Sequence, residues 1–281
     1  MSAEERPLSL PPSLVGKKIV LVNSSDILGG AAVVTFRLMQ ALRRAGLDAR
    51  MVVYTKLSEE ENVSDISMRW CRGTAFMLER LGIFVANGLS RERLFKISTA
   101  KFAINVHHHP WVKEADIVCL GWFNQGLLGL NGIRRLHKMG KKIVWTLHDM
   151  WAMTGICHHA CECDHFLDEC GRCQYLNGGG SPNDLSHKIW LKKNALYSEV
   201  PINYVTVSTW LEERARHSKL LRDMPLRTIH NPFPIDYYDI APSHPLTPVI
   251  SKQKTDIIAF GAARIDDPIK GLDIAIKALN H

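Results

Sequence analysis

The chain has 281 residues, a length that suits one large domain or two of ordinary size. Its hydrophobic fraction of 46% and charged fraction of 22% are those of a globular protein with a substantial core. The net charge of +7 permits nucleic acid, anionic lipid or phosphorylated partners, but no arginine-rich run with interleaved aromatic residues occurs, so no nucleic acid partner is expected. The sequence also lacks an apolar stretch of about 18 residues, so no membrane-spanning helix is expected.

Short apolar runs alternate with helical patterns along most of the chain. Residues 18–22 predict a buried strand, and residues 31–45 predict a helix that ends at Gly46. Further strands are predicted at residues 50–54, 116–120, 142–147, 203–208 and 227–229, with a helix at 210–221. Strands that are apolar on both faces and separated by helices indicate a parallel sheet covered on both sides. We therefore predict an α/β, doubly wound, Rossmann-like domain that binds ligands beyond the carboxyl ends of its strands.

The domain organisation is predicted in four parts. Residues 1–16 lack the basic-then-apolar order of a signal peptide and predict a flexible arm. Residues 17–231 predict the N-terminal domain, and five prolines among polar residues indicate an interdomain linker over residues 232–254. Residues 255–281 predict the first β-α unit of a second domain, with a strand at 256–261 followed by Arg264, Lys270 and an apolar helix. No further β-α unit follows, so we expect the second domain to be truncated in this chain.

Two short segments next to predicted strands are candidate binding sites. Gly29 and Gly30 precede the first helix, where small residues let backbone N–H groups approach a phosphate or a sugar; the alternative is a tight turn that only needs glycine dihedral angles. His148 and Asp149 end the strand at 142–147, where an α/β sheet presents its chemistry. Asp149 would orient the imidazole of His148, which would bond to a sugar hydroxyl or a phosphate. The alternative is a polar pair that only closes the strand.

Five of the seven cysteines fall between residues 157 and 173, with three histidines among them. Cys170 and Cys173 have the spacing that places two thiolates on one tetrahedral ion, and we predict that Cys157 and Cys163 complete a zinc site. Four thiolates leave no open position for a substrate, so this zinc would be structural. Disulfides and free buried thiols are the alternatives, and a chain without a secretory signal favours metal over disulfides.

Two further segments are ambiguous. The three histidines at 107–109 precede a proline and predict a surface loop rather than a metal site. Residues 68–95 combine aromatic and aliphatic side chains with arginines that include Arg72, Arg80, Arg91 and Arg93. This composition indicates either core packing or a basic amphipathic face that touches anionic lipid.

In their order and spacing, these segments resemble the bacterial glycosyltransferases of family 4, which have two facing Rossmann-like domains (the GT-B fold). The resemblance runs from about residue 17 to the last residue. Residues 146–158 resemble the His-Asp-Met-Trp block and cysteine loop of a subset that acts in surface polysaccharide synthesis. The other matching segments are the glycine turn at 23–31, the segments at 207–211, 218–221 and 229–232 that lead into the hinge, and the diphosphate motif at 261–271.

The resemblance implies a retaining, hexosyltransferase-type enzyme that moves a sugar from a nucleotide-sugar to a saccharide or lipid-linked acceptor, without a catalytic metal. It implies that Arg264 and Lys270 neutralise the departing diphosphate and that His148 lies near the donor sugar. The residues implied in substrate binding are Gly29, Gly30, Asp149 and Asn231. The family's Glu-x7-Glu segment, which holds the donor, would lie beyond residue 281. We therefore expect residues 1–281 to lack most of the donor site and to be inactive by themselves.

Two other classes of protein are weighed against this one. The first is a zinc-stabilised module that binds a saccharide or a protein without catalysis. The second is a dinucleotide-dependent oxidoreductase, which the missing G-x-G-x-x-G spacing and ribose-binding acid disfavour. The expected location is the cytoplasm, with peripheral contact at the inner face of an anionic membrane.

Overall fold

The structure, a computed structural model, describes residues 10–66, 69–91, 93–232, 258–262, 265 and 267–279, with the side chains of 69–72 excepted. The chain divides into two compact units, Met1–Pro232 and Phe233–His281. The predicted linker at 232–254 therefore lies almost wholly outside the described residues. Each unit is described by itself.

The first unit is built on one sheet of seven parallel strands in the order β3-β2-β1-β4-β5-β6-β7. The parallel, doubly wound sheet expected from the sequence is thus confirmed. The chain starts at β1, moves outward to β2 and β3, and then returns to place β4 on the other side of β1. The strands are β1 (Lys18–Ser25), β2 (Asp48–Thr55), β3 (Val63–Asp65), β4 (Ile117–Leu120), β5 (Lys142–Leu147), β6 (Ile202–Thr206) and β7 (Leu226–Thr228).

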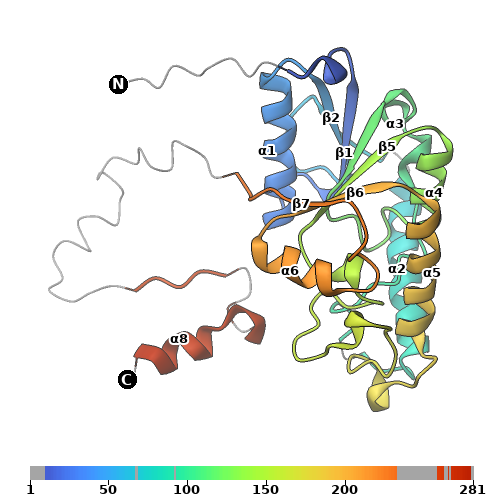
Figure 1. Cartoon of the computed structure of the whole chain (residues 1–281), viewed down its shortest axis with the longest axis vertical. Coiled ribbons are helices and arrows are strands. Elements are labelled where there is room, and N and C mark those ends of the chain that lie inside the picture. The colour runs from blue at the N-terminus through green and yellow to red at the C-terminus, as the bar shows by residue number, and fades with distance from the viewer. Residues whose placement is uncertain are drawn as a thin grey trace, which may run out of the picture. The chain divides into compact units, whose positions relative to one another are not determined.

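Helices cover both faces of this sheet. Figure 1 shows α1 on one side of the strands and α4 with α5 on the other. The α-helices of the unit are α1 (Gly30–Arg44), α2 (Arg69–Ala86), α3 (Pro110–Glu114), α4 (Leu130–Lys138), α5 (Leu185–Glu199) and α6 (Thr209–His217). Short 3-10 turns lie at η1 (Pro12–Leu14), η2 (Val106–His108), η3 (Trp151–Met153), η4 (His165–Leu167) and η5 (Asn177–Gly179).

The alternation of side chains along β1 divides the core into two layers. Leu21 packs with Met39 of α1 and Met51 of β2 on one face. Val20 and Val22 belong to the larger cluster on the opposite face, which also contains side chains of α4 and α5. Because both faces of the central strand are buried, only its end is available for a ligand.

The turn after α1 has the predicted form. Gly46 adopts a φ of +87°, and its N–H bonds to the carbonyl of Arg43. The left-handed conformation at the end of a helix favours glycine. The start of α5 carries a cap that was not predicted: the Asp184 carboxylate accepts bonds from the N–H groups of Ser186 and His187.

The second unit contains η7 (Pro268–Lys270) and α8 (Leu272–Leu279). The predicted apolar helix after Lys270 and Gly271 is confirmed, and Gly271 has a φ of +73° at the junction. Residues 258–262 form no strand, so the strand predicted at 256–261 is wrong for its described part. In the part of the chain that the structure describes, no helix combines the length and the hydropathy needed to cross a membrane.

Candidate functional site

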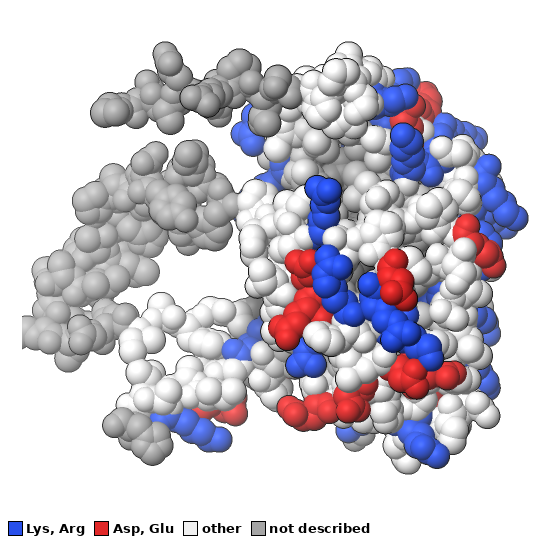
Figure 2. All heavy atoms as spheres, viewed as in Figure 1, with Lys and Arg blue, Asp and Glu red and all other residues white. Residues whose placement is uncertain are grey.

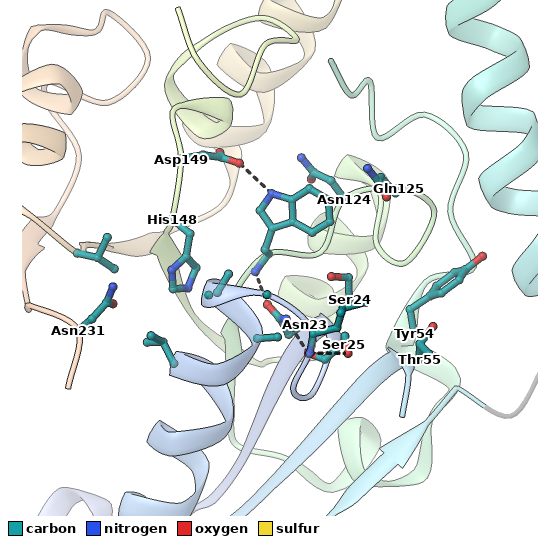
Figure 3. Close-up of a pocket in the computed structure, with 18 of the residues that line it drawn as sticks. Asn23, Ser24, Ser25, Tyr54, Thr55, Asn124, Gln125, His148, Asp149 and Asn231 are labelled. Atoms are coloured by element: carbon teal, nitrogen blue, oxygen red, sulfur yellow. Dashed lines mark hydrogen bonds between the residues drawn. The ribbon is translucent and has the colours of Figure 1, made fainter. Parts of the chain in front are cut away.

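A pocket of about 720 Å³ lies at the carboxyl ends of the strands, across the point where the strand order reverses between β1 and β4. Open α/β sheets bind their ligands at this position because the loops diverge there. The pocket is lined from the ends of β1, β2 and β5, the start of α1, and the loops that follow β4, β6 and β7. Figure 3 shows Asn231 and His148 on one side of it and Tyr54 and Thr55 on the other.

The start of α1 forms the floor of this pocket. Gly29 has a φ of +92° and is the N-terminal cap, and no side chain caps the helix. A Cβ atom on Gly30 would meet no atom within 4 Å, so the backbone here is open to a ligand. The first N–H groups of a helix have no partner within it and carry partial positive charge. The end of α1 is therefore arranged to accept an anion or a sugar oxygen.

His148 follows β5 directly and lines the same pocket. Burial lowers the pKa of its imidazole, while the neighbouring charge of Asp149 acts in the opposite direction. Its Nε2 atom is buried and has no hydrogen-bond partner among the described residues. A buried polar atom without a partner is costly, so this nitrogen is an unsatisfied donor or acceptor beside the pocket.

Asp149 bonds to a different histidine from the one predicted. Its Oδ2 atom lies 2.6 Å from Nδ1 of His158 and accepts a bond of 2.8 Å from Nε1 of Trp122, and its Oδ1 atom accepts from the N–H of Trp151. The expectation that Asp149 orients His148 is therefore wrong: consecutive residues at a strand end point in different directions. Burial, the largest single effect, raises the pKa of Asp149, but His158 and the two tryptophan N–H groups together lower it below its usual value.

The Asp149–His158 pair continues to a serine. Nε2 of His158 lies 2.9 Å from Oγ of Ser98, so the three side chains form a Ser–His–Asp chain. Ser98 is 0% exposed and His158 is 7% exposed, so no substrate reaches the hydroxyl. These three side chains therefore fix the position of Asp149 at the pocket wall, and Ser98 does not act as a nucleophile.

A buried lysine holds the turn that follows Asp149. Lys193 of α5 is 0% exposed, and its ammonium group donates to the carbonyls of Trp151 and Thr154. The same Nζ atom lies 3.4 Å from the ring centroid of Trp151. Burial lowers the pKa of Lys193 to about 7. Nothing in the sequence marks this residue, because a lysine in an amphipathic helix is expected at the surface.

Several pocket residues were not predicted. Asn23 at the end of β1 accepts a bond of 2.6 Å from the N–H of Trp122 and thereby holds the loop after β4 against β1. Asn124 and Gln125 of that loop line the pocket, and Gln125 has a φ of +65°. Because this loop follows the predicted strand at 116–120, the rule that ligands bind beyond strand ends would have identified it.

Five of the predicted site residues line this one pocket. The pocket residues among them are Gly29, Gly30, His148, Asp149 and Asn231. Lys270 is exposed at the end of η7 in the second unit, and Arg264 lies outside the described residues. The functional roles of all seven residues stay predictions.

The cysteine-rich segment contains the four thiols of the predicted zinc site. In the described ranges, no group of three or more His, Cys, Asp or Glu side chains is placed to hold a metal ion, and the thiols of Cys157, Cys163, Cys170 and Cys173 are free. Burial raises the pKa of Cys157 and Cys170 to about 12, which favours the neutral thiol. Each of these two pKa values is raised further by neighbouring cysteines, so the thiols lie in one region of the structure. Zinc at these cysteines stays a prediction from spacing.

The histidines at 107–109 have local partners. Nδ1 of His109 accepts from the N–H of Trp111 at the start of α3, and its Nε2 atom lies 3.2 Å from Oγ of Ser64. Nε2 of His107 lies 3.1 Å from the guanidinium of Arg135. These contacts are those of a surface turn, as predicted from the proline that follows.

No model of a known protein family matches the chain. Over 175 residues the chain is 25% identical to a protein of Escherichia coli (strain K12) named "Putative colanic acid biosynthesis glycosyl transferase WcaC". The match covers 61% of this chain and 43% of that protein. The chain thus aligns with less than half the length of this relative.

Proposed function

We propose that the chain takes part in glycosyl transfer from a nucleotide-sugar to a saccharide or lipid-linked acceptor in the synthesis of a surface polysaccharide. The observation that carries the proposal is the pocket at the strand ends, which is lined by the open start of α1 and by His148, whose buried Nε2 atom has no partner among the described residues. The similarity to a glycosyl transferase named for colanic acid biosynthesis supports the class of reaction and the kind of product.

The pocket suits a ligand that carries both phosphate and hydroxyl groups. The uncapped N–H groups of α1 suit phosphate oxygens, since they need no countercharge from a side chain. Nε2 of His148 and the side chains of Asn124 and Asn231 suit hydroxyl groups. The strand β2 ends in Tyr54 and Thr55 and not in an acidic residue, which disfavours a dinucleotide cofactor because the ribose of such a cofactor bonds to an acid at this position.

In the proposed reaction the bond between the anomeric carbon of the donor and the diphosphate oxygen breaks, and its electron pair leaves with the diphosphate. The acceptor hydroxyl oxygen forms the new bond to that carbon on the same face, and its proton passes to the departing diphosphate. Arg264 and Lys270 stabilise the charge that develops on the leaving group. Loss of one such contact typically costs on the order of 10²–10³ in rate. No step requires a metal ion from the protein.

The chain is proposed to supply the acceptor side of the enzyme and to act at the cytoplasmic face of the membrane. Donor recognition would then fall to the domain that begins with the second unit. Figure 2 shows basic side chains interspersed with acidic ones on the face viewed, an arrangement that suits small phosphorylated ligands better than a nucleic acid backbone.

The test is a transfer assay on the protein as its own cells make it, and on residues 1–281 alone. Nucleotide-sugars labelled in the sugar are incubated with a lipid-linked acceptor extract, and transfer to lipid is measured, with the anomeric configuration of the product determined by NMR. We expect transfer with retention by the cellular protein and none by residues 1–281. The His148→Leu variant should lose at least tenfold in rate, whereas His108→Leu, at an exposed residue outside the pocket, should not. An inverted product, or equal rates for both variants, would contradict the proposal.

A further inference from the structure

From residue 73 onward, helix α2 presents apolar side chains to solvent and keeps its charges inside. Between residues 73 and 89 the charged residues are Glu79 and Arg80, and they are 0% and 6% exposed. The Glu79 carboxylate accepts bonds from the N–H groups of Thr99 and Ala100, so it is held within the protein. The α2 apolar surface, as we call the outer side, consists of Met77 (65% exposed), Leu78 (45%), Leu81 (53%), Val85 (59%) and Leu89 (64%).

This pattern is the reverse of an ordinary surface helix, whose apolar stripe faces the core. The core-packing interpretation of the sequence therefore holds for Ile83, which is buried, but not for the five outer side chains. A contiguous exposed apolar face marks a surface that contacts another molecule or a membrane.

The surroundings of the α2 apolar surface are strongly basic. Residues 69–101 contain seven basic and two acidic residues, so this segment carries +5 of the chain's net charge of +7. Arg91, Arg93 and Lys96 are exposed just beyond the end of the helix. An apolar face flanked by cations is the combination that binds an anionic lipid surface.

A cationic cavity lies beside this surface. It has a volume of about 440 Å³, and its charged lining residues are Lys101, Arg134, Arg135 and Lys192, with no acidic residue among them. The uncapped start of α4 at Leu130 also lines it. The segment 99–105 separates the cavity from α2. On one side its Phe102 ring would contact a Cβ atom at Gly82 of α2 at 3.1 Å, and on the other side Lys101 faces the cavity.

We propose that the α2 apolar surface and the cationic cavity together bind an anionic lipid bilayer, with the outer side chains of α2 in the acyl region and a lipid phosphate in the cavity. The cavity is what favours lipid over a protein partner or a second copy of this chain, because Lys101, Arg135 and Lys192 line one small space and suit a single phosphate group, while Arg134 beside them is paired with Glu199. The charge of the whole 69–101 segment acts in the same direction.

The α2 apolar surface reaches the rim of the strand-end pocket. Phe76 lines that pocket and precedes Met77, and its ring lies 6.5 Å from that of Phe95, which is 65% exposed. Membrane binding itself does not depend on the proposed function. Membrane binding would allow the polar end of a lipid-linked acceptor to enter the pocket while the acceptor's lipid tail stays along α2. This role of membrane binding rests on the proposed function in glycosyl transfer.

The test is co-sedimentation of the full chain with vesicles of phosphatidylcholine alone and with about one third phosphatidylglycerol. We expect binding to the anionic vesicles that weakens as salt is raised. The double variant Leu81→Glu, Val85→Glu should lose affinity for these vesicles by a factor on the order of ten or more. The double variant Lys101→Gln, Lys192→Gln should lose about fivefold per lysine.

Two exposed positions away from α2 provide matched controls. Leu38→Glu on α1 and Arg227→Gln on β7 make the same kinds of change and should bind like the unaltered chain. Failure of the unaltered chain to bind anionic vesicles, or equal losses in controls and test variants, would overturn the proposal. A dimer that Leu81→Glu dissociates, without vesicle binding, would assign the surface to a second copy instead. Vesicle binding that survives His148→Leu, with or without sugar transfer, separates this proposal from the proposed function.

Discussion

Lys193 provides a quantitative test of how the turn beside the pocket is held. Its pKa is lowered from 10.5 to about 7 by burial, with the charges of two cysteines and Asp149 acting in the opposite direction. Between these two values the unfolded chain binds a proton that the folded chain has released. The free energy of unfolding therefore rises with pH in this window and is lowest when both states are protonated, below about pH 7.

The magnitude follows from the size of the shift. Each pKa unit corresponds to about 1.4 kcal/mol, so the penalty on the folded state is roughly 4 kcal/mol at pH 7. Roughly 2 kcal/mol of this should be recovered between pH 7 and pH 8.5. Above that range the opposite effect begins, because the pKa values of Cys157 and Cys170 are raised from 9.0 to about 12 in the folded chain.

The assay is urea unfolding followed by tryptophan fluorescence, in a reducing buffer at several pH values from about 7 to 8.5. Lys193→Met keeps the length of the side chain and removes the titration, while it leaves the carbonyls of Trp151 and Thr154 without their donor at about 1–3 kcal/mol each. We expect the slope against pH to vanish in this variant and to persist in Lys192→Met, at the exposed neighbour. An equal slope in Lys193→Met and the unaltered chain would refute the reasoning.

Three further outcomes are expected. Gly29→Ala should lower the melting temperature, because a φ of +92° costs a residue with a Cβ atom about 1–2 kcal/mol. Gly30→Ala is the control and should melt like the unaltered chain, since its Cβ atom would meet no atom within 4 Å. Equal melting temperatures of the two variants would contradict the geometry. Asp149→Asn should cost about 1.5–3 kcal/mol at neutral pH. Because the pKa of Asp149 is lowered from 3.8, its contribution to the free energy of unfolding is present above that pH and is lost as the pH falls through the folded pKa. Acid unfolding that is identical in Asp149→Asn and in the unaltered chain would count against the pairing of Asp149 with His158. If the spacing-based zinc prediction is right, metal analysis should give one zinc per chain, and Cys170→Ser or Cys173→Ser should lower both metal content and melting temperature; a metal-free chain unaffected by chelator would rule it out.

The sheet could be predicted because its strands are local apolar runs. The segments 18–22 and 50–54 are mostly buried on both faces, and 142–147 is buried on one face and half-buried on the other; such apolar runs suit a covered parallel sheet. The short strand β3 and the helices α2, α3, α4 and α5 were not predicted individually. Three residues carry too little pattern to mark a strand, and α2 has its apolar side chains on the outside, so its periodicity does not indicate the core.

The pocket could be located from the sequence more readily than its contacts. Gly29, Gly30 and His148 follow strand ends, and parallel strands bring such ends to one edge of the sheet. The partner of Asp149 could not be predicted, because His158 is supplied by a turn nine residues later whose path depends on tertiary packing. The burial of Lys193 could not be predicted for the same reason. Its burial depends on where α5 lies against η3, and helical spacing does not reveal that.

The central claim is that the strand-end pocket binds a sugar linked to diphosphate. The most direct measurement is an amide NMR titration of the chain with a short-chain prenyl diphosphate monosaccharide. We predict shifts of the N–H resonances of Gly30, Ala31 and Ala32, and binding that is at least tenfold weaker in His148→Leu but unchanged in His108→Leu. Resonances at the start of α1 that do not move at saturating probe, or equal affinities of the two variants, would contradict the account.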